Sequence, residues 1–170
     1  MDTRKILIAA AIAAALPAAP ALAASPSNTA TASGKALLLL PLTLTKVNDL
    51  QFGTIVSSAV AGTVTINAAS GARTHTGGVT EVGSDPGQRA LFDWAGTPGQ
   101  QVNFDLSYPT TLDDGAGNSV QVALLYLQSS TAIADSAGVV EVGVGGSILV
   151  SANQPEGTYS NTFQVTANYQ

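Results

Sequence analysis

The sequence has no cysteine, one histidine, one tryptophan and few charged side chains. Without cysteine, the chain forms neither a disulfide nor a thiolate metal site. Charged residues make up 10% of the 170 residues, well below the roughly 25% of average soluble domains. A formal charge of −5 with only six basic residues excludes the basic patch that nucleic acids and anionic lipids require. We therefore expect neither nucleic acid nor a lipid surface as a partner.

The first 23 residues have the composition of a cleaved export signal. A positive pair, Arg4 and Lys5, precedes apolar residues 6–16 and a small-x-small motif that ends at Ala23. An uncleaved membrane anchor is the alternative, but the apolar run is short and is followed by prolines, which disfavours a bilayer span. We predict cleavage after Ala23 or Ala24, and no membrane insertion after cleavage.

Residues 24–36 are small and polar, which is typical of a flexible arm. Small or apolar side chains nevertheless recur at every second position, so one apolar face runs from the arm into a first strand predicted to begin at Leu37. Pro41 limits this strand to a sheet edge or a bulge, because proline cannot donate to a ladder. The segment is either an ordinary strand with a frayed start or an arm for another molecule's groove. The recurring residues are Ala30, Ala32, Gly34, Ala36, Leu38, Leu40, Leu42 and Leu44.

The last fourteen residues predict a long amphipathic strand after a turn at Gly157. Apolar and polar positions alternate with period two, broken only at Asn161, as in a strand with one face on a core. Such a terminal strand at a sheet edge has outer N–H and C=O groups that need a partner. Its apolar row is Tyr159, Phe163, Val165, Ala167 and Tyr169.

The rest of the chain predicts an all-β domain over residues 37–170, with eight or nine short strands in an antiparallel sandwich or barrel. Residues 120–127 are apolar enough for a central strand covered on both faces. Residues 132–137 are expected to form a helical turn at most. The other predicted strands are residues 50–56, 62–68, 89–94, 101–107 and 139–152. By alternation, Val64 and Ile66 point inward, and Val102, Phe104 and Leu106 share one face of their strand. The last of these segments contains two apolar runs joined by Gly145 and Gly146.

Several of these motifs together resemble a known family. The glycine fourteen residues from the end, Gly157, and the penultimate Tyr169 resemble the end of exported chaperone–usher pilin subunits. The LQFG of residues 50–53 and the GTVTI of residues 62–66 are also pilin-like. With GTPGQQV and VGGSILV, they resemble the domain of unknown function 4402 family more closely, over about residues 37–170.

This resemblance implies an immunoglobulin-like sandwich that lacks one strand, whose gap is filled first by a periplasmic chaperone and then by the arm of the next subunit. Many such pilins carry a disulfide near the first strand, which is absent here. The implied donor residues are Ala30, Ala32, Gly34, Ala36, Leu38 and Leu40. The implied residues of the accepting C-terminal strand are Gly157, Tyr159, Phe163, Val165, Ala167 and Tyr169.

The implied function is a non-enzymatic structural subunit of a surface fibre, which passes through the periplasm to the cell surface. Its partners are copies of itself or related subunits, a periplasmic chaperone and an outer-membrane usher. The alternative is a secreted monomer that binds a glycan or a protein, with residues 37–44 completing its own sandwich.

No cofactor, metal or catalytic set is expected. His75 stands alone and is interpreted as a surface residue. Residues 113–115 (DDG) lack the carboxylate spacing of a calcium loop. Trp94 is interpreted as a core residue rather than a sugar platform.

Overall fold

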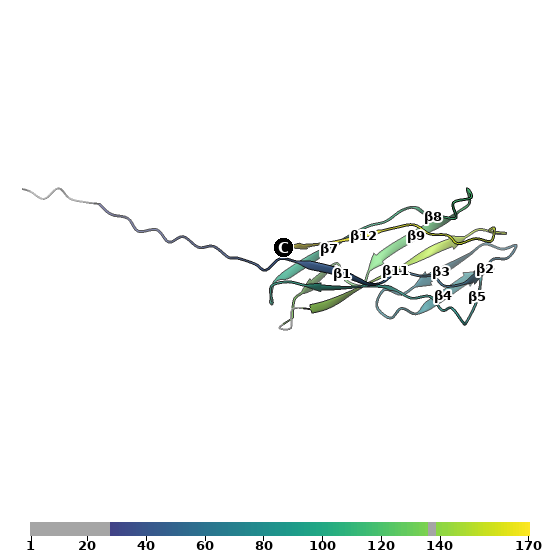
Figure 1. Cartoon of the computed structure of the whole chain (residues 1–170), viewed down its shortest axis with the longest axis horizontal. Helices are drawn as coiled ribbons and strands as arrows, with labels where there is room; N and C mark the ends of the chain where they lie inside the picture. Colours follow the sequence, from purple (N-terminus) through teal and green to yellow (C-terminus); the bar gives the residue numbers. More distant parts are fainter. Residues whose placement is uncertain (1–27, 136–138) are drawn as a thin grey trace, which may run out of the picture. The chain divides into compact units, whose positions relative to one another are not determined.

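Residues 28–135 and 139–170, which the computed structural model describes, form β-strands and no helix (Figure 1). The strands pair antiparallel throughout, so the predicted all-β antiparallel class is confirmed. The predicted signal peptide, residues 1–23, lies outside the described residues. The strands are β1 (Thr43–Asn48), β2 (Ile55–Val56), β3 (Gly62–Ile66), β4 (Arg73–Gly77), β5 (Thr80–Glu81), β6 (Ala90–Ala95), β7 (Gln101–Ser107), β8 (Thr111–Asp113), β9 (Ser119–Leu127), β10 (Thr131–Ile133), β11 (Val139–Val150) and β12 (Gln164–Tyr169).

Strand β11 is the centre of the larger sheet, which we call sheet 1. Its first half pairs with β6, and its second half pairs with β3 and β9. Strands β1, β4 and β8 then join β6, β3 and β9. Gly145 permits the close approach of β3, because a Cβ there would collide with the backbone oxygen of Ile66. The two apolar runs that flank Gly145 and Gly146 therefore form one continuous strand.

The second sheet, sheet 2, has the order β10-β7-β12, so the C-terminal strand lies at one of its edges. Strand β7 has the predicted bounds, and Val102 and Phe104 are buried as the alternation predicts. Strands β2 and β5 form a separate short pair.

The two sheets pack against one another through a shared core. Trp94 and Val142 of sheet 1 meet Val102 and Phe104 of sheet 2 in one apolar cluster. The rings of Trp94 and Phe104 lie edge to face, with their centroids 5.4 Å apart. The assignment of Trp94 to the core is confirmed. A second cluster contains Val64, Val79, Val120, Val122, Leu125, Ile148 and Val150.

Strand β9 corrects the prediction that residues 120–127 are covered on both faces. Val122 pairs with Ile148 and Leu124 with Ser147, so Ala123 is an extra residue in the ladder. Such a bulge reverses the side-chain alternation beyond it. Leu125 is therefore buried, whereas Leu124, two residues after the buried Val122, is 47% exposed.

Two other predicted elements differ from the structure. Residues 50–56 do not form one strand, because Gly53 has a φ of 75°, which lies outside the range of a regular strand. Only Ile55–Val56 and an isolated bridge between Gln51 and Gln88 remain. Residues 132–137, for which a helical turn at most was expected, form no helical turn over their described part, because Thr131–Ile133 is strand β10.

The first strand begins at Thr43 rather than at Leu37. Pro41 has no N–H for a ladder, and the N–H of Leu40 donates instead to Thr97 Oγ1 at 2.7 Å. Among the described residues, strand β1 pairs with β6 and no other strand, so the predicted edge position is confirmed. Residues 37–170 form one compact unit, and residues 28–36 form no strand.

Candidate functional site: an open border between the two sheets

The outer edge of β12 has unpaired backbone groups. Antiparallel partners alternate between hydrogen-bonded and non-bonded pairs. The N–H of Gln170 donates to Gln101, which fixes the alternation along the strand. The backbone groups of Val165, Ala167 and Tyr169 therefore point away from β7. In the part of the chain that the structure describes, no other strand pairs with this edge.

The side chains of the same three residues are apolar and only half-buried. Val165, Ala167 and Tyr169 lie on the inner face and pack against the cluster around Trp94, as the sequence predicts. The intervening positions of the strand are exposed. At this edge, unpaired backbone groups therefore lie beside apolar core side chains that are only half-buried.

Strand β1 supplies the facing wall from sheet 1. Leu42 and Leu44 pack against the same cluster and are also half-buried. The ladder alternation points the backbone groups of Leu44 away from β6. We call the outer edges of β12 and β1, with Leu42, Leu44, Val165, Ala167 and Tyr169, the open border. The sequence pattern contained both leucines, but neither was among the predicted site residues.

The two walls meet at one end of the border. The hydroxyl of Tyr169 accepts a hydrogen bond from the N–H of Thr97 at 2.7 Å and donates one to the oxygen of Leu40 at 2.8 Å. Gly96 leaves the space for this contact, because a Cβ there would meet both the Tyr169 hydroxyl and Leu42. Figure 1 shows β12 ending beside the start of β1, with the two strands running in opposite directions.

At the other end, β12 starts later than predicted, at Gln164. Phe163, just before it, packs its ring edge to face against Phe92 of β6, with centroids 6.2 Å apart. Upstream of Phe163 the chain contacts sheet 1, where Ser160 forms a bridge with Asp113 of β8. The terminal segment therefore passes from one sheet to the other instead of forming one long strand.

Three residues predicted for the C-terminal strand lie outside the border, namely Gly157, Tyr159 and the Phe163 that precedes β12. Tyr159 packs against the other core cluster, and its hydroxyl donates to the oxygen of Pro155 at 2.7 Å. Gly157 lies near Asp114, which would be 3.3 Å from a Cβ placed on the glycine. The structure thus brings together only the last three apolar residues of the predicted row.

The predicted donor residues lie upstream of the border strand and are exposed. Ala30, Ala32, Gly34 and Ala36 form no regular structure. Leu38 is 86% exposed, which is the largest value among the exposed large apolar side chains of the described residues.

The comparison with family models gives one match. It is Domain of unknown function (DUF4402), and it covers residues 42–169. The chain belongs to the DUF4402 family. Neither the search of curated proteins nor that of solved structures returned a match.

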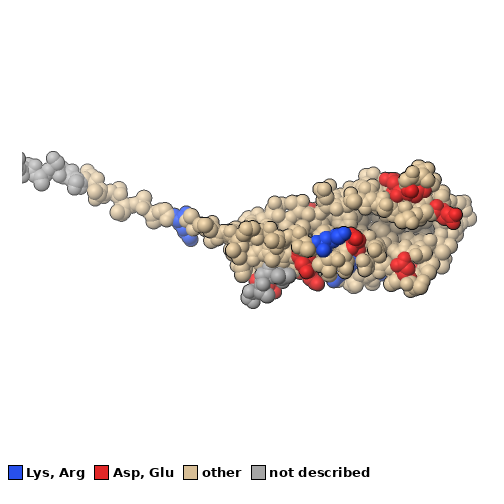
Figure 2. Space-filling view, in the orientation of Figure 1, with Lys and Arg blue, Asp and Glu red and all other residues tan. Residues whose placement is uncertain are grey.

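The described part of the DUF4402 domain has few charged side chains and no cluster of potential metal ligands. No three potential metal ligands gather among residues 28–135 and 139–170. His75 is exposed, and its Nδ1 lies 3.0 Å from a carboxylate oxygen of Glu81. Figure 2 shows few charged side chains on the visible face, with acidic atoms gathered near the end that carries β8. In the same described residues, no helix has the length and apolar character needed to cross a membrane.

The 113–118 loop forms a hydrogen-bonded turn around one carboxylate. Asp114 accepts bonds from the side chain and the N–H of Asn118, at 2.6 and 3.0 Å, and from the N–H of Ala116 at 2.8 Å. These bonds, that from the Asn118 side chain above all, lower the pKa of Asp114. The Asp114 carboxylate is therefore hydrogen-bonded within its own loop.

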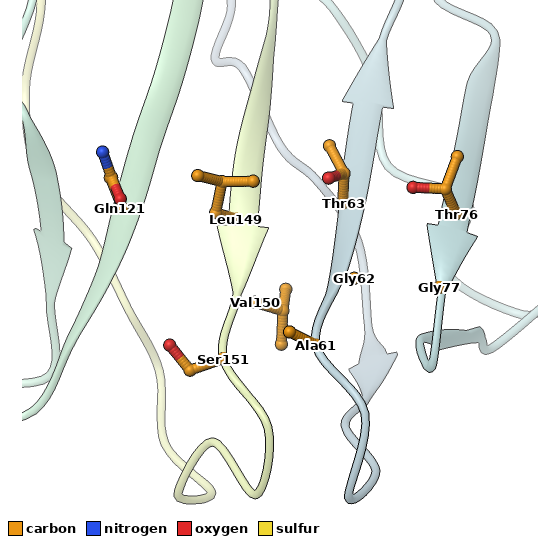
Figure 3. Close-up of a pocket in the computed structure, with 9 residues that line it drawn as sticks. All are labelled: Ala61, Gly62, Thr63, Thr76, Gly77, Gln121, Leu149, Val150 and Ser151. Atoms are coloured by element: carbon orange, nitrogen blue, oxygen red, sulfur yellow. The ribbon is translucent and has the colours of Figure 1, made fainter.

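A hollow of about 380 Å³ lies on sheet 1, across β3, β4, β9 and β11 (Figure 3). None of its lining residues is ionisable or aromatic, so it offers neither an acid–base pair nor a stacking surface for a sugar. The lining residues are Ala61, Gly62, Thr63, Thr76, Gly77, Gln121, Leu149, Val150 and Ser151.

Proposed function

We propose that this DUF4402 protein is an exported structural subunit of a surface fibre, and that each subunit closes its open border with a strand from another copy. The domain would then be an immunoglobulin-like sandwich that lacks one strand. The observation that carries the proposal is the outer edge of β12, where the free backbone groups of Val165, Ala167 and Tyr169 lie beside half-buried apolar side chains. An extended strand with apolar residues at alternate positions satisfies both needs at once.

The chain contains a segment with this pattern. Small or apolar residues alternate over the nine residues from Ala30 to Leu38, a length of about 30 Å in an extended strand. Strand β12 has 6 residues, or about 20 Å at the same rise. Leu40 was also predicted as a donor residue, but its backbone is bonded within its own domain. We therefore place the end of the donor segment at Leu38.

Two kinds of interaction would favour assembly. Each new backbone hydrogen bond contributes about 0.5–1.5 kcal/mol net, and apolar burial adds about 25 cal/mol per Å². Most of the donor side chains are alanine or glycine, so Leu38 should contribute the most. Ordering the arm opposes these gains.

The proposed passage of the subunit through the periplasm to the cell surface follows from the predicted export signal. A subunit with an open border is an aggregation hazard in the periplasm, because an unpaired sheet edge binds other strands. A periplasmic chaperone that covers the border, and an outer-membrane usher that exchanges it for the next arm, fit this need. The role is structural rather than enzymatic.

The proposal can be tested by substituting, in separate variants, one leucine on each face of the arm. Leu38→Asp places a charge on the face that would enter the border, and should abolish SDS-resistant ladders and high-mass species in light scattering. Leu37→Asp is the matched control, because Leu37 is also exposed and lies on the opposite face of an extended arm. Deletion of residues 24–36 should give a monomer.

Ladders that persist in Leu38→Asp would show that the arm is not the donor. A native chain that is monomeric with and without the arm would favour the secreted binding module instead.

A further inference from the structure

Leu40, just upstream of the border strand β1, has both of its backbone groups bound by side chains. Its N–H donates to Thr97 Oγ1 at 2.7 Å, and its oxygen accepts from the hydroxyl of Tyr169 at 2.8 Å. The N–H of Thr97 donates to that same hydroxyl at 2.7 Å. We call this closed ring of three hydrogen bonds the Leu40 clamp.

The clamp lies where the sequence would otherwise allow a turn. Leu40-Pro41-Leu42-Thr43 has proline at the second position, which is favoured in type I turns. Such a turn is closed by a bond from the N–H of Thr43 to the oxygen of Leu40. The ladder alternation directs the N–H of Thr43 to Ala95, and the oxygen of Leu40 is taken by Tyr169. No turn or bend occurs over residues 37–42.

A reversal at this point is what self-closure of the border requires. Tyr169 ends β12 beside Leu40, and β1 runs away from that end. For the arm of the same chain to lie between the two strands, it must therefore fold back on β1 as a hairpin. An arm from a second copy needs no such turn.

We propose that the Leu40 clamp prevents the arm from entering the border of its own subunit, so that the partner of the border is a second copy of this chain. This inference rests on the proposed function and adds to it the contacts that keep a subunit from closing its own border. Thr97 is a positioning residue in this scheme, because it acts on the arm through Leu40 and lies outside the open border.

The absence of cysteine allows a direct distance measurement on the full chain. Spin labels at Lys35→Cys and Gln164→Cys, with an excess of unlabelled chain, report the distance within one molecule. Leu40 is five residues from Lys35, and Tyr169 is five from Gln164, or about 17 Å along each extended segment. Without a reversal the labels should lie about 35 Å apart, and with self-closure they should lie within about 20 Å.

In the native chain we expect the long distance between the labels. In Thr97→Val we expect a second population of molecules with a short distance, because valine keeps the side-chain volume but removes the acceptor for the N–H of Leu40. Thr97→Ser keeps the hydroxyl and should behave as the native chain. Tyr169→Phe removes the other side of the clamp and should also give short distances.

Two results would overturn the clamp. One is a short distance between the labels in the native chain, and the other is a long distance alone in both Thr97→Val and Tyr169→Phe. Failure of the fibre proposal gives a different result, namely no polymer in the native sample, and the distances within one chain remain measurable in that case.

Discussion

Two neighbouring residues of β12 allow a sharp test of the open edge. The N–H of Ala167 points outward, whereas that of Thr166 points to Asp105 of β7. Ala167→Pro therefore removes an outer donor and leaves the sheet 2 ladder intact, as proline does on natural edge strands. We expect the isolated domain to lose less than about 1 kcal/mol of unfolding free energy.

Assembly should respond more strongly to Ala167→Pro. One hydrogen bond worth about 0.5–1.5 kcal/mol is lost, and the incoming strand is left with an unpaired carbonyl that costs about 1–3 kcal/mol. The sum of about 1.5–4.5 kcal/mol corresponds to a weakening of subunit association by roughly 10- to 2,000-fold. Sedimentation of purified subunits over a concentration series measures this change.

Thr166→Pro is the matched control, because it removes a ladder bond inside the domain. The unfolding free energy of the domain should then fall by the same amount, about 1.5–4.5 kcal/mol. The melting temperature should drop by roughly 3–18 °C. Equal destabilisation of the monomer by both prolines, or normal assembly of Ala167→Pro, would refute the assigned direction of the β12 backbone groups.

Three further predictions concern the scaffold. Gly145→Ala should lower the unfolding free energy by more than about 2 kcal/mol in a denaturant titration, because the new Cβ would collide with the backbone of β3. Gly34→Ala is the control and should have no effect on this free energy, since the space around Gly34 is open. Arg73→Lys should cost about 2–4 kcal/mol by the same titration, because the buried guanidinium bonds three backbone oxygens that an ammonium group cannot match; an unchanged midpoint would contradict this. The lowered pKa of Asp114 means that its stabilising contribution is present above the unfolded pKa and is lost as the pH falls through the folded one, on the acid side of pH 4. Asn118→Ala should raise the pKa of Asp114 in an NMR titration, and an unmoved titration curve would exclude that side chain as the cause.

Local patterns predicted much of the fold. The alternation of Val64 and Ile66, and of Val102 and Phe104, identified their strands and inner faces because a half-buried strand has period two. The same reasoning identified Val165, Ala167 and Tyr169 as the inner row of β12. For these residues, the local alternation of apolar and polar side chains is enough to identify the buried face.

The remaining features depend on partners that are distant in sequence. The bulge at Ala123 arises from the register between β9 and β11, which the alternation within β9 cannot reveal. The Leu40 clamp joins residues 57 and 129 positions apart. The passage of the terminal segment from sheet 1 to sheet 2 likewise depends on contacts with β8 and β7.

Amide hydrogen exchange along β12 tests the central claim most directly. In the monomer, the amides of Val165, Ala167 and Tyr169 should exchange quickly, while those of Thr166 and Asn168 are protected by β7. In assembled material the outer amides should become protected as well, and in Leu38→Asp they should stay fast. Slow exchange of Val165, Ala167 and Tyr169 already in the monomer would contradict an open border, because their N–H groups would then have a partner within the same chain.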